Sequence, residues 1–471
     1  MEKSCDDVEP TVDVATISKP NFSIVIIARN EEERIARNLS QAGIKAFMQD
    51  GGDVVIADTG STDNTMAMAE TLGARAVSLG KKHLHTLSKR MAKMINDMFV
   101  VSPEPPIVTA GETYFDFGSA RNDAHKHALH DMVLQIDMCD MLEVLDWRKL
   151  SAFIASGVTR FTYCHYLGPG TERQTIARFY DRRIDTWKGI SHEAIGWNLK
   201  PAGYVGVNGE DQGGQMQQGI TVSTKMLQVR YLRNIKKSRP YSIGMAIDIM
   251  KNPNDPRWLH YMGREMTPTY TNRPRSAIVL LEKQGDMENA WTPERSSSLT
   301  MAGLCYEALL FRHYDKRCAA NECWDTYSKD MLDKAMHSYW KAQYIDPSRR
   351  EPFIRLADLH RKLAIRTKNH DKLQHHWRSI LCFATAAMQI PNTTLLSEDE
   401  GNYREYPHDH AAYALSWLGR WSEAKYHHQK CLEYAPWCAR YRDESKLYEK
   451  HLAKEPECTA EEGSVPTENE K

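Results

Sequence analysis

Two aspartates that follow a short apolar run are the residues best suited to chemistry in this chain. Residues 132–136 (MVLQI) predict a buried strand, and Asp137 and Asp140 come directly after it. Carboxylates at the carboxyl end of a buried strand lie where open α/β sheets bind ligands. Their hard oxygen atoms suit Mg²⁺ or Mn²⁺ that carries a phosphate group. The alternative is a strand end capped by solvated acids.

A third aspartate ends another apolar run. Asp58 follows residues 53–57 (DVVIA) and precedes a helix expected over residues 65–72. A carboxylate at such a strand end can accept hydrogen bonds from a uracil N–H or a ribose hydroxyl. Asp63 lies in the same connection, and we interpret it as a helix-capping residue.

The elements that must position these acids alternate between strand and helix. Residues 22–28 (FSIVIIA) predict a buried strand, and a charged helix with apolar positions at Ile35 and Leu39 follows. The strand and helix around Asp58 repeat this order, and residues 74–77 predict a third short strand. Such alternation favours a parallel sheet with right-handed crossovers.

Four segments in this order resemble a known family. They read SIVIIARNEEERIARNL, VVIADTGSTDNT, FDFGSARNDA and VLQIDMCDMLE. Together they resemble the nucleotide-sugar-binding part of family 2 glycosyltransferases, and the resemblance covers residues 21–197 well and the rest weakly. It implies an α/β GT-A domain, Rossmann-like with a mostly parallel sheet. It also implies a metal-dependent transfer, with inversion, of a sugar from a UDP-linked donor.

The resemblance implies roles for residues in the first half of the chain. Those that match the grip on the nucleoside are Ala28, Asn30, Glu31, Asp58 and Ser61. Arg121 follows a Gly-Ser turn just before the acidic strand, where a guanidinium can pair with a diphosphate. The alternative for Arg121 is a surface arginine paired with a nearby acid.

The acidic motif departs from the pattern of the family. Members carry Asp-X-Asp followed by another acid, whereas this chain reads Asp137-Met138-Cys139-Asp140. Asp137 matches the first aspartate, Cys139 replaces the second, and Asp140 matches the trailing acid. Cysteine is a soft ligand and a poor choice for Mg²⁺. We therefore expect a cation held by Asp137 and Asp140, a weakened site, or metal bound mainly through the sugar diphosphate.

A second reactive group follows a strand expected over residues 175–180. The chain also resembles a subgroup of this family in which a helical, tetratricopeptide-like region follows the catalytic domain. In that subgroup an arginine-bearing strand precedes Gly-X-X-His-Glu, which Gly189, His192 and Glu193 match here. Glu193 is then the general base that takes a proton from the acceptor, and His192 orients it or contacts phosphate. A zinc-protease His-Glu-X-X-His motif is excluded because position 196 is Gly196. The alternative for Glu193 is a salt bridge at a strand end.

From Lys225 onward the composition predicts helices. The first run, KMLQVRYLRNIKKSR, is basic, and a solvated helix face is favoured over contact with nucleic acid. Later segments resemble tetratricopeptide repeats closed by prolines at positions 347, 391 and 436, which are 44 and 45 residues apart. Such arrays offer a concave face to a peptide, an acceptor polymer or a partner subunit, including a second copy of the chain.

Length and composition set the outer bounds. The 471 residues predict a flexible start (1–20), a GT-A domain (21–224), a helical region (225–454) and a disordered acidic tail (455–471). The net charge is −1, and the ten cysteines contain no CxxC pair, so we expect a cytoplasmic protein with reduced thiols. The sequence contains no signal-peptide or membrane-spanning pattern. We expect a nucleotide-sugar glycosyltransferase whose acceptor is a protein, a glycan or a modified DNA base. The alternative is a catalytically degenerate transferase that serves as a helical adaptor.

Overall fold

The chain folds into two compact units, one ending at Ile345 and the other beginning at Asp346. A computed structural model describes residues 9–167, 173–197, 219–231, 241–318, 324–391 and 400–452. The acidic tail expected over residues 455–471 lies outside these ranges, as does the basic stretch 232–239. The two units are described separately below.

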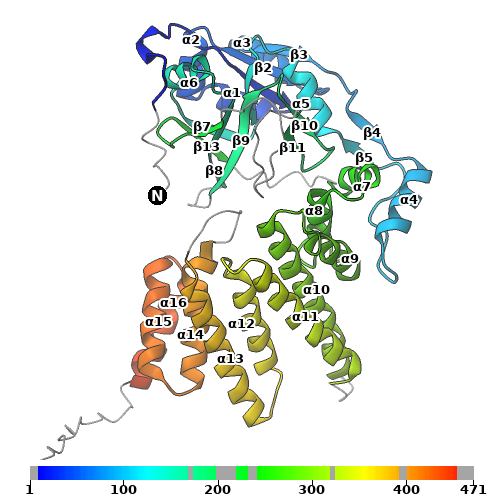
Figure 1. Ribbon diagram of the computed structural model, residues 1–471, viewed down its shortest axis with the longest axis vertical. Helices are drawn as coiled ribbons and strands as arrows, with labels where there is room; N and C mark the ends of the chain where they lie inside the picture. Colours follow the sequence, from blue (N-terminus) through cyan, green and yellow to red (C-terminus); the bar gives the residue numbers. More distant parts are fainter. Residues whose placement is uncertain are drawn as a thin grey trace, which may run out of the picture. The chain divides into compact units, whose positions relative to one another are not determined.

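Parallel strands form one half of a nine-stranded sheet in the first unit (Figure 1). Their order is β3 (Arg75–Ser78), β2 (Asp53–Asp58), β1 (Ser23–Ala28) and β6 (Met132–Asp137). The register pairs Ala28 with Asp58, and Ile27 with Asp137. The strands predicted from apolar runs are therefore confirmed, and their carboxyl ends meet at one edge of the sheet.

The other half of the sheet mixes strand directions. It contains β9 (Arg173–Asp181), β8 (Arg160–Leu167), β13 (Leu227–Tyr231) and β7 (Asp140–Leu145), with β12 (Gly219–Thr221) beside β8. Five of the eight strand pairings are parallel and three are antiparallel. The sheet is thus mixed, and the predicted class, an α/β domain followed by helices, is confirmed.

The segment that begins at Lys225 differs from its prediction. We expected a basic helix there, but residues 227–231 form β13, which lies between β8 and β7. Leu227 and Val229 are fully buried, whereas Gln228 and Arg230 are half-buried. This alternation has the two-residue period of a strand, and the sequence analysis gave it less weight than the basic composition. The sheet therefore extends beyond residue 224.

Helices cover both faces of the sheet and bury its apolar side chains. On one face, alternate residues such as Ile24 and Ile56 pack with α1 (Glu32–Leu39), α2 (Ala42–Gln49), α3 (Thr65–Thr71) and α6 (Trp147–Ala155). On the other face, Val25 and Val55 pack with α5 (Phe117–His125). Burial on both faces explains why these strands read as continuous apolar runs.

Smaller elements complete the sheet-containing part of the first unit. They are η1 (Val14–Thr16), β4 (Leu84–Thr86), α4 (Lys89–Phe99), β5 (Thr113–Phe115), β10 (Asp185–Lys188) and β11 (Ala194–Trp197). Two short antiparallel ribbons form, because β4 pairs with β5 and β10 pairs with β11. The first ribbon brings Tyr114 to the carboxyl edge of the sheet, and the second precedes and follows the segment that holds Glu193.

Five helices close the first unit. They are α7 (Tyr241–Lys251), α8 (Pro256–Met266), α9 (Pro274–Gly285), α10 (Thr292–Cys318) and α11 (Thr326–Ile345). Glycines allow close crossings, because a Cβ on Gly263 would lie 2.6 Å from Leu281 and one on Gly285 would lie 2.6 Å from Leu299. In the described ranges no helix, including the 27-residue α10, combines the length and apolar character needed to cross a membrane.

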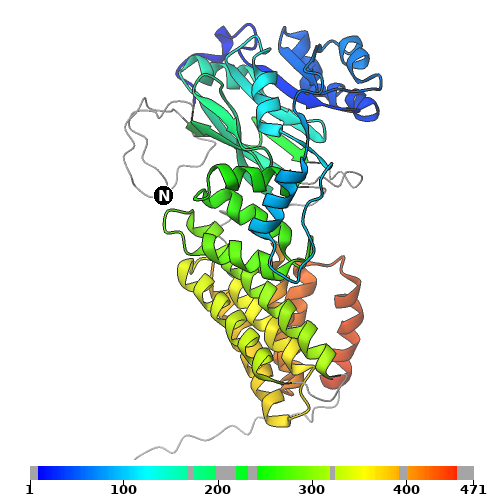
Figure 2. The same ribbon diagram turned by 90° about the vertical axis from the view of Figure 1, so that its right-hand side faces the viewer.

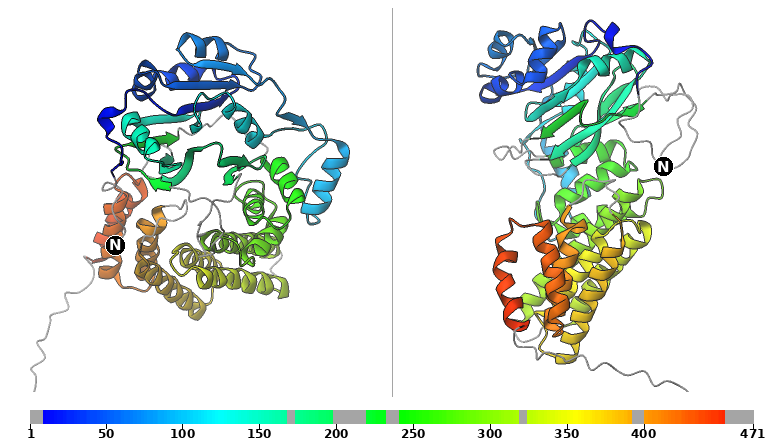
Figure 3. Two further views of the ribbon diagram at one scale, coloured as in Figure 1. Left: turned by 45° about the horizontal axis from the view of Figure 1, so that its top comes forward. Right: turned by 90° about the vertical axis from the view of Figure 1, so that its left-hand side faces the viewer.

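The second unit is a row of helices packed side by side (Figures 2 and 3). It contains α12 (Glu351–Ala364), α13 (His370–Gln389), η2 (Glu400–Tyr403), α14 (Glu405–Trp417), α15 (Trp421–Tyr434) and α16 (Ala439–Leu452). Small side chains let neighbouring helices approach, and Ala357, Ala364 and Ala414 surround the buried ring of Trp377. This packing agrees with the predicted helical-repeat character.

Candidate active site

Asn30 ties together the two loops that follow β1 and β2. Its backbone has φ 52°, a left-handed conformation that asparagine adopts more readily than most residues. Its Oδ1 accepts a hydrogen bond from the N–H of Thr62 at 2.8 Å, and its own N–H donates to Ser61 Oγ at 2.9 Å. Two residues predicted to grip a nucleoside, Asn30 and Ser61, are therefore in direct contact.

The side chain of Asp58 holds the loop that follows β2 in place through hydrogen bonds to its backbone. Its side chain is buried, and its carboxylate accepts hydrogen bonds from the N–H groups of Gly60 at 3.0 Å and Ser61 at 3.1 Å. The turn requires glycine because Gly60 has φ 95° and a Cβ there would lie 2.8 Å from Lys81. The N-cap of α3 is Asn64, and Asp63, one residue before it, accepts a hydrogen bond from the N–H of Thr65 at 3.1 Å.

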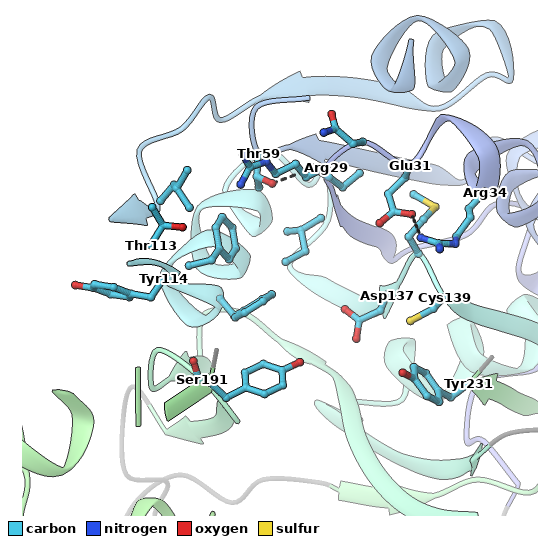
Figure 4. A pocket seen from close by; sticks show the side chains of 18 residues that line it. Arg29, Glu31, Arg34, Thr59, Thr113, Tyr114, Asp137, Cys139, Ser191 and Tyr231 are labelled. Carbon is cyan, nitrogen blue, oxygen red and sulfur yellow. Dashed lines mark hydrogen bonds and ion pairs between the residues drawn. The ribbon is translucent and has the colours of Figure 1, made fainter. Parts of the chain in front are cut away.

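A cavity of about 530 Å³ opens at the carboxyl edge of the sheet (Figure 4). Figure 4 shows Asp137 and Cys139 side by side in it, with Tyr231 nearby and Tyr114 on the far side. Of the predicted site residues, four line this first cavity: Ala28, Asn30, Glu31 and Asp137. Those that belong to the same edge but not to the lining are Asp58, Ser61 and Asp140.

Asp137 ends β6 between two guanidinium groups. Its carboxylate lies 2.8 Å from Arg121 Nη2 and 3.1 Å from Arg178 Nη1, and 29% of its side chain is exposed. Asp137 lines the first cavity and also a second, adjacent cavity. Guanidinium groups held in this way can also bind the oxygen atoms of a phosphate.

Asp140 lies behind Asp137 instead of beside it. Its buried Oδ2 accepts a hydrogen bond from the N–H of Asp137 at 2.9 Å, and Oδ1 lies 3.3 Å from His165 Nε2. Arg178 approaches the same carboxylate at 3.9 Å. Asp140 therefore fixes the turn that presents Asp137 and Cys139 to the cavity.

Arg121 links the two cavities. It lies on α5 with its side chain buried, and it forms ion pairs with Asp137 and with Glu193. Its guanidinium lies 4.6 Å from the centre of the Trp187 ring, so stacking also holds it in place. The predicted phosphate-binding arginine and the predicted general base therefore meet directly.

The segment that carries His192 and Glu193 is clamped by close backbone contacts. Gly189 has φ 90°, and a Cβ on it would lie 2.4 Å from the Trp258 ring of α8. A Cβ on Gly118 of α5 would lie 2.3 Å from the carbonyl oxygen of Gly189. Neither position tolerates a side chain without a shift in its neighbour. The glycine of the Gly-X-X-His-Glu motif is therefore required by close packing as well as by its backbone conformation.

Hydrogen bonds hold the same segment from two further sides. The N–H of Phe117 donates to the carbonyl of Ile190 at 3.0 Å, and the N–H of Ile190 donates to Asp248 Oδ2 at 2.6 Å. Burial raises the pKa of Asp248 from its ordinary value of 3.8 to about 6, and its hydrogen bonds with Ile190 and Ser191 offset part of this rise. Asp248 therefore positions the segment and is itself costly to ionise.

His192 packs among aromatic rings from α7 and α8. It has φ 50°, and its ring stacks on Tyr261 at 4.6 Å with an interplanar angle of 11°. Burial lowers the pKa of His192, and the approach of Glu265 at 3.8 Å opposes this only in part. His192 is therefore a neutral imidazole at neutral pH.

The second cavity, of about 520 Å³, is rich in arginine. Its lining contains two acids, Asp137 and Glu193, and five arginines: Arg121, Arg160, Arg178, Arg257 and Arg264. Three of the arginines also approach acids outside the lining: Arg160 lies 3.5 Å from Asp185, Arg257 lies 4.0 Å from Glu294, and Arg264 lies 3.7 Å from Glu265. Phe117, Asp137 and Tyr241 line both cavities, so a ligand in one lies next to a ligand in the other.

Several lining residues were not among the predicted site residues. Trp187, Arg257, Tyr261 and Arg264 line the second cavity, and the last three come from α8. The sequence analysis assigned that helix to a separate helical region, so its residues were not considered. Arg178 lies on β9, within the strand expected over residues 175–180, and the arginine-bearing strand of the motif could have identified it.

The residues around Asp137 fit a divalent cation that is bound mainly through the phosphates of its substrate. Mg²⁺ is often bound through one or two protein carboxylates and the phosphates of its substrate. Asp137 offers one partly exposed carboxylate to the first cavity, while Asp140 accepts a hydrogen bond from the Asp137 amide. The structure therefore suits a cation that would take one carboxylate from the protein and its other ligands from a diphosphate and water.

Comparisons with known proteins give weak structural likenesses only. No family model matches the chain, and no curated protein matches it. Staphylococcus aureus TarS 1-349, in complex with UDP-GlcNAc, has a TM-score of 0.29 at 12% identity, covering 91% of this chain and 92% of that one. The mannosyltransferase PcManGT from Pyrobaculum calidifontis, with GDP-Man and Mn²⁺, has a TM-score of 0.29 at 14% identity, covering 72% and 90%.

A further likeness concerns helical repeats. The tetratricopeptide protein TTC0263 from Thermus thermophilus has a TM-score of 0.29 at 16% identity, covering 45% of this chain and 90% of that one. The structural neighbours thus include both nucleotide-sugar glycosyltransferases and tetratricopeptide proteins. At these scores they carry no argument, and the architecture rests on the strand order and helix packing described above.

Proposed function

We propose that this protein is a glycosyltransferase that moves a sugar from a nucleotide-sugar donor, UDP-linked, to an acceptor nucleophile. The observation that carries the proposal is the position of Asp137. It ends β6 between Arg121 and Arg178 and faces two adjacent cavities. A group-transfer enzyme needs such a junction, because its two substrates must meet at the atom that is transferred.

The first cavity is the proposed donor site. Ala28, Asn30 and Glu31 border it from the β1 loop, and Asp137 and Cys139 border it from the β6–β7 turn. Asp58 and Ser61 support the nucleoside side by holding the neighbouring loop in place. The resemblance to family 2 glycosyltransferases supports uridine as the base.

Arg121 and Arg178 are the proposed binding groups for the donor's diphosphate. When the bond between the anomeric carbon and the diphosphate oxygen breaks, negative charge grows on the departing diphosphate. Two guanidinium groups beside Asp137 are placed to stabilise that charge. A Mn²⁺ or Mg²⁺ ion held by Asp137 and the phosphates would add positive charge at the same oxygens.

Glu193 is the proposed general base. An acceptor hydroxyl in the second cavity would pass its proton to a Glu193 carboxylate oxygen as the acceptor oxygen bonds to the anomeric carbon. In the structure Glu193 is engaged by Arg121, and a carboxylate paired with a guanidinium is a poor proton acceptor. Binding of a diphosphate would draw Arg121 toward phosphate and release Glu193. A single displacement of this kind inverts the anomeric centre.

The charge of the second cavity bears on the acceptor. Its five arginines offer guanidinium groups that can bind phosphate or carboxylate groups of an acceptor. Among a protein side chain, a glycan and a modified DNA base, this supports an anionic glycan or a nucleic acid. None of the five arginines lines the first cavity, but Arg121 and Arg178 contact Asp137, which lines both cavities. The proposed contacts with the acceptor therefore come from the other three, Arg160, Arg257 and Arg264.

The alternative is a degenerate transferase that serves as an adaptor. Cys139 motivates it, because a thiol stands where the family has a carboxylate. A donor screen separates the two functions: the protein is incubated with UDP- and GDP-sugars and Mn²⁺, and released nucleoside diphosphate is measured by mass spectrometry. The enzyme should release diphosphate from at least one donor, faster when an anionic acceptor is added. No release from any donor, together with no donor-dependent rise in Tm, would support the adaptor.

A further inference from the structure

We propose that His360, His375 and His376 form a binding site for a divalent transition metal, of which Zn²⁺ is the best match. The site lies in the second unit, between α12 and α13, and shares no residue with the proposed active site. Within the described ranges, these residues are the only set of three or more side chains arranged to hold a metal.

The three histidines converge from two neighbouring helices. His360 comes from α12 and its side chain is buried, while His375 and His376 are consecutive on α13. The centre of the His360 ring lies 5.9 Å from that of His375 and 5.2 Å from that of His376. Consecutive residues of a helix point about 100° apart. His375 and His376 therefore approach the ring of His360 from two different directions.

The distances between nitrogen atoms are close to those of a metal site. One nitrogen from each ring lies within 4.8 Å of the other two, and the Nδ1 atoms of His360 and His376 are 3.1 Å apart. A metal–nitrogen bond of about 2.0–2.1 Å in a tetrahedral site separates its ligand nitrogens by about 3.3 Å. The His360–His376 pair already has this spacing, and His375 needs a shift of roughly an ångström, within rotamer freedom.

A simple hydrogen bond between His360 and His376 is the ordinary explanation, and it leaves one observation unexplained. This observation is the approach of His375 to the same point, which such a bond does not need. A metal ion bound by one nitrogen from each of the three rings accounts for it.

The ligand chemistry selects the class of metal. Three imidazoles with no carboxylate suit Zn²⁺, Cu²⁺ or Ni²⁺ and do not suit Mg²⁺ or Ca²⁺. His375 is exposed, so an ion has a path from solvent and can keep a water as its fourth ligand. A bound ion would join α12 to α13 and stabilise the second unit.

The chain contains its own control for this proposal. His408 of α14 and His427 of α15 form a similar pair between neighbouring helices, with their Nδ1 atoms 2.8 Å apart. In the described residues no third ligand joins that pair. Loss of His408 should therefore remove a histidine contact of the same kind without removing a metal site.

The test is metal binding by untagged full-length protein after treatment with EDTA. Zn²⁺ is titrated against a chromophoric chelator, and Co²⁺ is used to record the absorption bands of a tetrahedral ion. The parent and all its variants carry Asp137→Ala, so that the proposed donor site does not contribute to Zn²⁺ binding. We expect one Zn²⁺ per chain, at least a tenfold loss of affinity in His375→Ala, and no loss in His408→Ala.

Thermal unfolding gives a second readout. Zn²⁺ at a hundred times its Kd should stabilise the parent by about 2.7 kcal/mol and so raise its Tm, and His375→Ala should lose most of this rise. His375 is exposed, so its replacement should leave the folded state intact. Equal Zn²⁺ affinity in the parent and His375→Ala, or no tetrahedral Co²⁺ spectrum in the parent, would overturn the proposal. Neither result would bear on the proposed glycosyltransferase activity.

Discussion

The guanidinium of Arg121 contacts the carboxylates of both Asp137 and Glu193, and its Nη2 lies 2.8 Å from Asp137. Asp137 borders both cavities and Glu193 borders the second, so one buried arginine connects the proposed leaving-group site with the proposed base. The two acids are 56 residues apart in sequence and come from different elements. In the proposed mechanism, donor binding would therefore be coupled to the release of the base through a single side chain.

Replacement of Arg121 by lysine should lower kcat/KM strongly. Lysine keeps the charge but cannot reach two carboxylates, or a diphosphate, with a planar fork of donors. We expect a loss of ~10²–10³-fold, the usual effect of removing a group that stabilises a developing anion. Steady-state release of nucleoside diphosphate measures it.

The matched control for this prediction is Arg148→Lys. Arg148 is half exposed on α6, and its guanidinium stacks on Trp147 at 4.3 Å, away from both cavities. It should leave kcat/KM unchanged. If both variants lost activity equally, Arg121 would have no special role in the transfer.

Replacement of Glu193 by glutamine should abolish transfer and preserve donor binding. The amide keeps the shape of the side chain but cannot take a proton, and loss of a general base lowers rates by ~10²–10⁴-fold. Binding of UDP, measured by calorimetry, should stay within a few fold of the parent. Full transfer in Glu193→Gln would remove Glu193 as the base and favour a salt bridge as its role.

Much of the fold could be predicted from apolar patterning, whereas the site could be predicted only in part. The strands at the carboxyl edge were predictable because burial on both faces makes each one a continuous apolar run. β13 was not predicted, because Leu227 and Val229 alternate with polar residues inside a basic stretch. The composition of the stretch was given more weight than its period.

Some of the site residues could likewise be predicted from the sequence, and others could not. Asp137, Arg121 and Glu193 could be named because each lies in a motif with a defined place beside a strand. Arg257 and Tyr261 could not, because they reach the second cavity from α8, and only the folded chain brings that helix to the sheet. The direction of the Asp140 side chain could not be predicted from the sequence either, because it depends on a hydrogen bond from the backbone N–H of Asp137.

Asp248→Asn should stabilise the protein at pH 7.5 more than at pH 4.5. Burial raises the pKa of Asp248 to about 6 in the folded state, above its ordinary value of 3.8. The folded chain therefore binds this proton more tightly than the unfolded chain, and stability is lost as pH rises from about 4 to 6. Asparagine accepts the hydrogen bond from Ile190 without ionising, so the variant avoids this loss.

Urea unfolding of both proteins at the two pH values measures this effect. The free energy of unfolding of Asp248→Asn relative to the parent should rise by about 1–3 kcal/mol between pH 4.5 and 7.5, as expected for a shift of about two pKa units. Other titrating groups are common to both proteins and cancel in the difference. A difference that does not change with pH would contradict the raised pKa of Asp248.

Gly189→Ala should destabilise the fold and impair transfer together, whereas Gly111→Ala should do neither strongly. Both glycines have φ near 90°, so both alanines are strained by about 1 kcal/mol. At Gly111 the added methyl meets nothing within 4 Å, but at Gly189 it would lie 2.4 Å from the Trp258 ring. That overlap should cost about 1–3 kcal/mol more and displace Glu193, which follows four residues later. Urea unfolding and diphosphate release test both effects, and equal stability of the two variants would show that Trp258 does not clamp this segment.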